Sequence, residues 1–84
     1  MPLKDELETL IKNPTSGIDA PELELEETSN GKVGGFVISP TFAGKPQFDR
    51  QNMLWDYLDH NLDKDQILHI VSLVTLTPDE AKED

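Results

Sequence analysis

Ile67-Leu68-His69-Ile70-Val71-Ser72-Leu73-Val74-Thr75-Leu76 is the most apolar run of the chain, and it is rich in β-branched residues. β-branched side chains pack well on a pleated surface, so this run predicts a strand. Polar residues at Asp63–Gln66 interrupt the pattern before it. We expect Ile67–Leu76 to form the central strand of a sheet.

The residues on either side of this run predict two helices. Thr77-Pro78-Asp79-Glu80 combines a capping threonine, a proline suited to the first helical position and a glutamate three residues after the threonine, which predicts a short final helix. Upstream, Asp49 is placed to cap a helix that runs to about Asn61. The buried stripe of this helix is expected to consist of Met53, Leu54, Tyr57, Leu58 and Leu62.

The first half of the chain predicts a helix followed by a hairpin. Apolar residues recur at helical spacing over Pro2–Lys12. Acid alternates with leucine over Glu22–Glu26, which predicts a strand with its carboxylates in water. Asn30-Gly31 suits a tight turn, and Val33–Ser39 reads as the return strand. Gly34-Gly35 within it predicts a bulge or the close approach of another backbone.

These elements define an α+β fold with the order helix, strand, strand, helix, strand, helix. We expect a three-stranded mixed sheet with the helices packed on one face. Val33–Ser39 should pair antiparallel with Glu22–Thr28, and the C-terminal strand should join on the other side. A chain of 84 residues with 36% hydrophobic content encloses one core, so residues 1–84 are expected to form a single domain.

The charge balance restricts the partners that the chain can bind. Its 17 acidic and 7 basic residues give a formal net charge of −10, which repels phosphate backbones and anionic membranes. The absence of cysteine excludes a disulfide and a nucleophilic thiolate. Met1–Lys12 has no continuous apolar stretch, so we expect no signal peptide and a cytoplasmic location.

The residues that could carry chemistry give no positive support for catalysis. His69 lies near the start of the expected strand, on the face of Val71 and Leu73, where a packing or hydrogen-bonded histidine is the commoner case. His60 lies near a helix C-terminus, which favours a cation. Gly31-Lys32-Val33-Gly34 matches a nucleic-acid-binding GxxG pattern, but in a hairpin it is turn chemistry. We therefore expect a binding protein and not an enzyme.

From Phe42 to Glu80 the chain resembles the BolA family, whose members have a KH-like α+β fold of class II. Phe42-Ala43-Gly44-Lys45 is similar to the F-x-G loop of that family, and Phe48-Asp49-Arg50-Gln51-Asn52-Met53-Leu54 to its arginine-led helix start. Leu68-His69-Ile70-Val71-Ser72-Leu73 resembles the family's histidine-containing strand, and the final threonine, proline and acid motif also matches. Order and spacing agree.

The resemblance implies an adaptor that binds a monothiol glutaredoxin and takes part in iron–sulfur cluster handling or iron-linked regulation. It implies His69 as a ligand of a two-iron two-sulfur cluster shared with the glutaredoxin and glutathione, which supply the thiolates that this chain lacks. It also implies that His69, the loop Phe42–Pro46 and the turn near Asn30 lie on neighbouring parts of the protein surface. The expected partner-binding residues are Phe42, Gly44, Lys45, Arg50 and His69.

Two alternatives remain open. Some family members are described as DNA-binding transcriptional regulators, and Lys45 and Arg50 would then contact nucleic acid against the negative field of the whole chain. The family commonly has a histidine where this chain has Gln51, and a cysteine or histidine in the loop that here reads Glu27–Gly31. This loop therefore offers no second ligand, and an interaction domain without the metal role is the other alternative.

Overall fold

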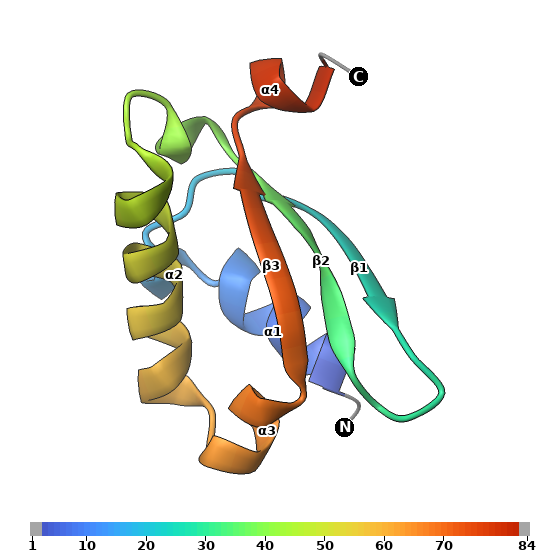
Figure 1. Cartoon of the computed structure of the whole chain (residues 1–84). Coiled ribbons are helices and arrows are strands. Elements are labelled where there is room, and N and C mark those ends of the chain that lie inside the picture. Colours follow the sequence, from blue (N-terminus) through green and yellow to red (C-terminus); the bar gives the residue numbers. More distant parts are fainter. Residues whose placement is uncertain (1–2, 83–84) are drawn as a thin grey trace.

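A computed structural model describes residues 3–82 and confirms the α+β fold with a three-stranded mixed sheet (Figure 1). The expected order of elements is confirmed, with one short helix added before the last strand. Pro2, the expected first residue of helix α1, lies outside the described residues. The elements are α1 (Leu3–Lys12), η1 (Pro14–Ser16), β1 (Glu22–Glu27), β2 (Val33–Ile38), η2 (Pro40–Phe42), α2 (Gln47–Asn61), α3 (Lys64–Leu68), β3 (Ile70–Leu76) and α4 (Pro78–Lys82).

The sheet has the order β1-β2-β3, so β2 is its central strand. β1 pairs antiparallel with β2 through the expected hairpin, and β3 joins the other side of β2 in parallel. The expectation that the C-terminal strand is central was wrong. The strand is apolar on both faces. Ile70 and Leu73 cover the core, whereas Val71 and Val74 are apolar but exposed.

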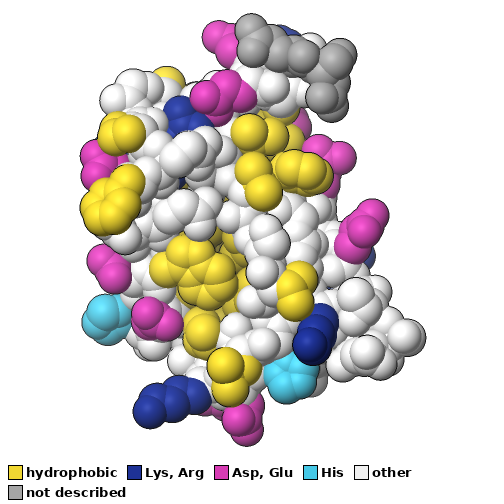
Figure 2. Space-filling model, viewed as in Figure 1, with side chains coloured by type: hydrophobic (Ala, Val, Ile, Leu, Met, Phe, Trp, Pro, Cys, Tyr) yellow, Lys and Arg dark blue, Asp and Glu magenta, His cyan; other side chains and the backbone are white. Residues whose placement is uncertain are grey.

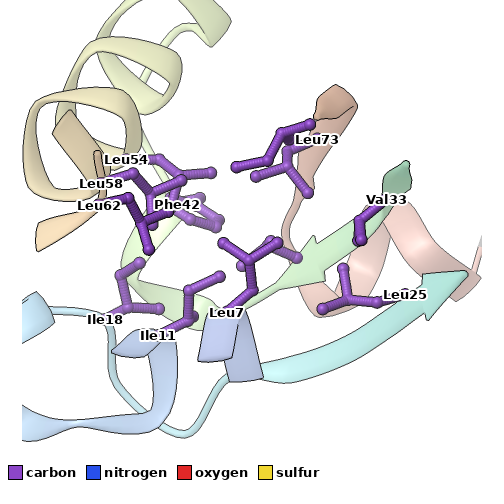
Figure 3. Packing of buried hydrophobic residues seen from close by; sticks show 12 residues of the cluster. Leu7, Ile11, Ile18, Leu25, Val33, Phe42, Leu54, Leu58, Leu62 and Leu73 are labelled. Carbon is purple, nitrogen blue, oxygen red and sulfur yellow. The ribbon is translucent and has the colours of Figure 1, made fainter. Parts of the chain in front are cut away.

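The helices α1 and α2 cover one face of the sheet and enclose the core (Figure 1). Figure 3 shows Leu54 and Leu58 of α2, and Leu62 just after it, beside Phe42 and facing the side chains of α1. Burying an aliphatic or aromatic side chain of this size stabilises a fold by about 1.5–3 kcal/mol. The buried cluster consists of Leu7, Ile11, Ile18, Leu25, Val33, Val37, Phe42, Leu54, Leu58, Leu62, Ile70 and Leu73.

The glycine pair in β2 allows the three strands to approach closely, as predicted. Val33 pairs with Ile70 but Gly34 pairs with Ser72, so Val71 is the extra residue of a bulge. Gly35 has a φ of +148°, and a Cβ there would overlap the Glu24 carbonyl. The backbone conformation and the neighbouring strand both require glycine at position 35.

The start of the apolar run is helical and not extended. Asp63 caps α3, so Ile67 and Leu68 lie in this helix and His69 ends it. His69 therefore precedes β3, Val71 bulges outward, and the expectation that these two side chains share a face with Leu73 was wrong. The capping box of Asp63 and Gln66 outweighs the β-propensity of two following apolar residues.

The two remaining helix starts differ, because α2 begins without a side-chain cap and α4 begins with one. α2 begins at Gln47 and so earlier than expected, and Asp49 lies in its first turn instead of capping it. The predicted capping box of α4 is confirmed, because the Glu80 N–H donates to Thr77 Oγ1 at 3.1 Å and the Thr77 N–H donates to Glu80 Oε1 at 2.8 Å. Among the described residues, no helix is long and apolar enough to cross a membrane.

Candidate functional site

His69 lies exposed at the junction between α3 and β3. Its backbone carbonyl accepts a hydrogen bond from the Val33 N–H at 2.8 Å, which joins the junction to the start of β2. Its ring Nδ1 lies 2.6 Å from the Asp65 carbonyl oxygen. Because a carbonyl oxygen only accepts, Nδ1 carries the proton and donates. Nε2 of the neutral ring then presents a lone pair, which is the form of imidazole that binds metals.

A short chain of hydrogen bonds fixes the turn that carries this imidazole. The Gln66 N–H donates to Asp63 Oδ1 at 2.9 Å, and the Asp63 N–H donates to Gln66 Oε1 at 3.0 Å. The Gln66 amide also donates to Glu6 Oε2 at 2.6 Å, which ties α3 to α1. The Asp65 carbonyl that orients His69 therefore belongs to a helix anchored on the core.

The donor set fits a role as one ligand of a shared metal group. The sequence has no cysteine, and within residues 3–82 no three His, Cys, Asp or Glu side chains are grouped so that they could hold a metal ion. A single imidazole nitrogen does not make a metal site by itself. His69 therefore fits a metal group only if a partner supplies the other ligands.

His60 provides an internal comparison for His69. Its Nδ1 lies 2.7 Å from the Asp56 carbonyl oxygen, four residues earlier, so its ring is held in the same way. It is also exposed, but it lies in the last turn of α2 and not at the sheet. Both imidazoles reach the surface, as the space-filling view shows (Figure 2). The two histidines differ in place and not in local geometry.

The loop Phe42–Pro46 lies at the other end of the sheet from His69, so the expectation that they are neighbours was wrong. β2 and β3 run parallel, with Val33 beside Ile70 at one end and Ile38 beside Leu76 at the other. The loop follows the second end, whereas the turn near Asn30 precedes Val33 and lies at the end of His69. Only this turn shares the neighbourhood of His69.

The loop residues expected to bind a partner have different environments. Phe42 is 0% exposed and belongs to the core, so its side chain supports the loop and offers no surface to a partner. Gly44 has a φ of +76°, which a glycine adopts readily, and space is open around it. Gly44 and Lys45 are both exposed. Their role in binding stays a prediction.

Arg50 is 6% exposed and acts within the fold. Its Nε donates to the Lys45 carbonyl at 2.7 Å, and its Nη1 lies 2.7 Å from Glu80 Oε1 and 3.3 Å from the Thr75 carbonyl. The Arg50 hydrogen bond lowers the pKa of Glu80, and the hydrogen bond from the Thr77 N–H lowers it further. A guanidinium engaged in this way has little capacity left for a phosphate group or a partner.

The glutamines of α2 cover the edge strand β3. The Gln51 amide donates to the Leu73 carbonyl at 2.9 Å, and the Gln47 amide donates to the Thr75 carbonyl at 2.9 Å. The Trp55 indole N–H in turn donates to Gln51 Oε1 at 3.0 Å. Side chains that bond an edge strand prevent its pairing with another chain. Sequence reasoning noted Gln51 only as a departure from the family pattern and missed this contact, because the paired residues are 22 positions apart.

No protein-family model matches the sequence, and no curated protein matches it. Among solved structures, the chain is similar to the crystal structure of a Bol-like protein from Babesia bovis, with 18% sequence identity and a TM-score of 0.50. The alignment covers 98% of this chain and 90% of that chain. Likeness at this identity shows the fold, and it agrees with the motifs from Phe42 to Glu80. The chain therefore has a BolA-like fold.

Proposed function

We propose that the chain is a non-enzymatic adaptor that supplies His69 as one ligand to an iron–sulfur cluster shared with a monothiol glutaredoxin and glutathione. The observation that carries this proposal is the exposed imidazole with its Nδ1–H held by the Asp65 carbonyl at 2.6 Å. This bond leaves Nε2 as the coordinating nitrogen and limits rotation of the ring. Imidazole suits iron and replaces thiolates in some two-iron clusters.

The donor set of the chain supports a shared site. The chain has no cysteine, so the thiolates must come from the glutaredoxin and glutathione. The contribution of this chain is to hold one neutral nitrogen ligand in a fixed direction at the edge of the sheet. A bound iron–sulfur cluster can be transferred to another protein or can carry electrons. In the proposed complex, the shared cluster is cargo that the two proteins hold together.

Charge supports a protein partner over DNA. The net charge of −10 opposes a phosphate backbone. Of the two cations expected to contact nucleic acid, Arg50 is buried against Glu80 and only Lys45 is exposed. Lys45 without Arg50, in the negative field of the whole chain, is a weak basis for affinity to DNA.

The test uses the chain mixed without oxygen with a monothiol glutaredoxin, glutathione and reconstituted cluster. Visible absorption and circular dichroism are recorded for the unchanged chain and for His69→Ala and His60→Ala. His69→Ala should lose the spectrum specific to the mixed complex, because the only exposed imidazole at the sheet is gone. His60→Ala removes an imidazole with the same local geometry and should keep that spectrum.

Size-exclusion chromatography of the same mixtures separates the adaptor from a domain that only binds. If the complex forms and His69→Ala leaves its spectrum unchanged, the ligand role is wrong and an interaction domain without a metal role is favoured. If the unchanged chain forms no complex with glutaredoxin, with or without cluster, the choice of partner is wrong.

A further inference from the structure

The face of the sheet opposite α1 and α2 contains a hollow of about 520 Å³, which we call the open-face socket. Figure 2 shows hydrophobic side chains along β3 and between β3 and α2, with acidic, basic and histidine side chains around them. The residues that shape the socket are Glu24, Glu26, Gly34, Gly35, Phe36 and Val71.

The register of the strands explains why the socket exists. On this face Glu24 pairs with Phe36, and Glu26 pairs with Gly34, which in turn pairs with Ser72. Gly34 has no side chain and Ser72 has a small one, so a gap is left beside Phe36. The gap is a further consequence of the glycine pair, beside the bulge and the close approach of the strands.

The walls of the socket differ in chemistry. Phe36 is 43% exposed and Val71 is 59% exposed, because the bulge moves Val71 out of the strand alternation. Both present apolar surface to water. On the β1 side the exposed carboxylates of Glu24 and Glu26 line the hollow, two residues apart on one face of the strand.

We propose that the open-face socket binds an extended segment of a partner protein in which a bulky apolar side chain is flanked by lysine or arginine. The apolar side chain lies between Phe36 and Val71, whose methyl group lies over Gly34, and removes the surface of both from water. The flanking cations contact the carboxylates of Glu24 and Glu26. Apolar anchors with complementary charges at the rim are typical of peptide-binding grooves.

The same charges argue against other occupants of the socket. A second copy of the chain would bring two rows of glutamates together on molecules that each carry −10, and like charges in contact oppose association. Phosphate groups are repelled for the same reason. A basic, partly apolar protein segment is the occupant that satisfies both walls.

This inference goes beyond the proposed function because it needs neither the cluster nor His69. Val71 nonetheless follows His69 by only two residues, so a segment in the socket lies beside the α3–β3 junction. The experiment uses no metal and no glutaredoxin. Its failure and the failure of the proposed function are therefore separate results.

The test titrates the isotope-labelled chain with the blocked peptide Thr-Arg-Leu-Arg-Thr and follows the amide signals by NMR. The matched probe is Thr-Glu-Leu-Glu-Thr, which keeps the apolar residue and reverses the charge. The basic peptide should shift the Gly34, Gly35 and Phe36 signals to saturation, and the acidic peptide should leave them in place.

Variants on the socket separate its two walls. Glu24→Gln combined with Glu26→Gln should weaken binding of the basic peptide by about three- to tenfold, since two exposed ion pairs are lost. Asp56→Asn combined with Asp59→Asn removes two exposed charges from α2 and should change the affinity by less than about twofold. Val71→Ser should weaken binding without affecting folding, because the side chain is exposed.

Three results would overturn the proposal. One is equal binding of the acidic and basic peptides. Another is that the α2 control variant weakens binding of the basic peptide as much as the variant of the two socket glutamates does. The third is a dependence of the Gly34–Phe36 signals on protein concentration without peptide, which would identify a second copy of the chain as the occupant.

Discussion

The two ends of the β2–β3 pair are built in opposite ways. At the Leu76 end, Arg50, Gln47 and Glu80 form a hydrogen-bonded group around the buried Thr75. At the His69 end, the Val33 N–H donates to the His69 carbonyl, and the imidazole lies in solvent. Hydrogen-bonded side chains around a buried residue lie at the first end, and the candidate ligand lies at the second. The exposed His69 ring makes one local hydrogen bond, so the fold depends little on this side chain.

The largest effect should come from Arg50→Met, which keeps the buried stem and removes the guanidinium. The Lys45 carbonyl then loses its donor, and the Thr75 carbonyl and Glu80 each lose one of their donors, beside an arginine site that is 6% exposed. We expect the free energy of unfolding in urea to fall by about 2–4 kcal/mol. Lys45→Met is the control, because it removes an exposed cation at the same end and keeps the Lys45 carbonyl. Equal effects of the two changes would contradict the importance of this group.

Thr75→Val should have the next largest effect. The Thr75 side chain is 0% exposed; its hydroxyl donates to Gln47 Oε1 at 2.8 Å and accepts from the Gln51 amide at 3.3 Å. Valine keeps the shape but leaves both glutamines without this partner, which should cost about 1–2 kcal/mol in urea unfolding. Ser72→Ala changes an exposed hydroxyl on the same strand and should have almost no effect. A tolerated Thr75→Val would show that packing alone holds this end.

Acid should weaken the Leu76 end of the sheet. Arg50 holds the pKa of Glu80 below its ordinary value of 4.5, with help from Thr77. A carboxyl whose pKa is lower in the folded state stabilises the fold above its unfolded pKa, and this stabilisation is lost as the pH falls through the folded value. The difference in urea midpoint between the unchanged chain and Glu80→Gln should therefore be full near neutral pH and shrink in acid. A difference independent of pH would contradict the ion pair.

The smallest effect on stability should come from His69→Ala. The ring is exposed and makes one local hydrogen bond, so we expect the free energy of unfolding to change by no more than about 0.5 kcal/mol. His60→Ala should behave the same, because its ring is held in the same way. A loss from His69→Ala as large as that from Thr75→Val would identify His69 as a structural residue.

The sequence predicts local patterns well and long-range contacts poorly in this fold. Glu22–Glu26 and the Thr77–Glu80 cap carry their structure in adjacent residues, and both are confirmed. The hairpin turn is also confirmed, although Gly31 has the expected positive φ and Asn30 does not. The placement of Phe42 in the core and the Arg50–Glu80 pair depend on segments that meet only in the folded chain, 30 positions apart for the pair. Nothing in the local pattern signals them.

The error at the α3–β3 junction has the same cause and affects the candidate site directly. Asp63 and Gln66 carry a capping box, which the apolar run after them obscured. Recognising this cap would have predicted a helix that begins at Lys64 and would have placed the start of the apolar run in that helix. The family motif identified the histidine, but only the structure gives its exposure and the orientation of its ring.

Hyperfine spectroscopy of the reduced cluster in the complex with glutaredoxin tests the central claim most directly. Only this chain carries nitrogen-15 histidine, so any imidazole nitrogen-15 that couples to the cluster comes from one of its two histidines. The account predicts one strongly coupled imidazole nitrogen that disappears in His69→Ala and persists in His60→Ala. A cluster without coupling to the labelled nitrogen, or a coupling that survives His69→Ala, would contradict the assignment of His69 as the ligand.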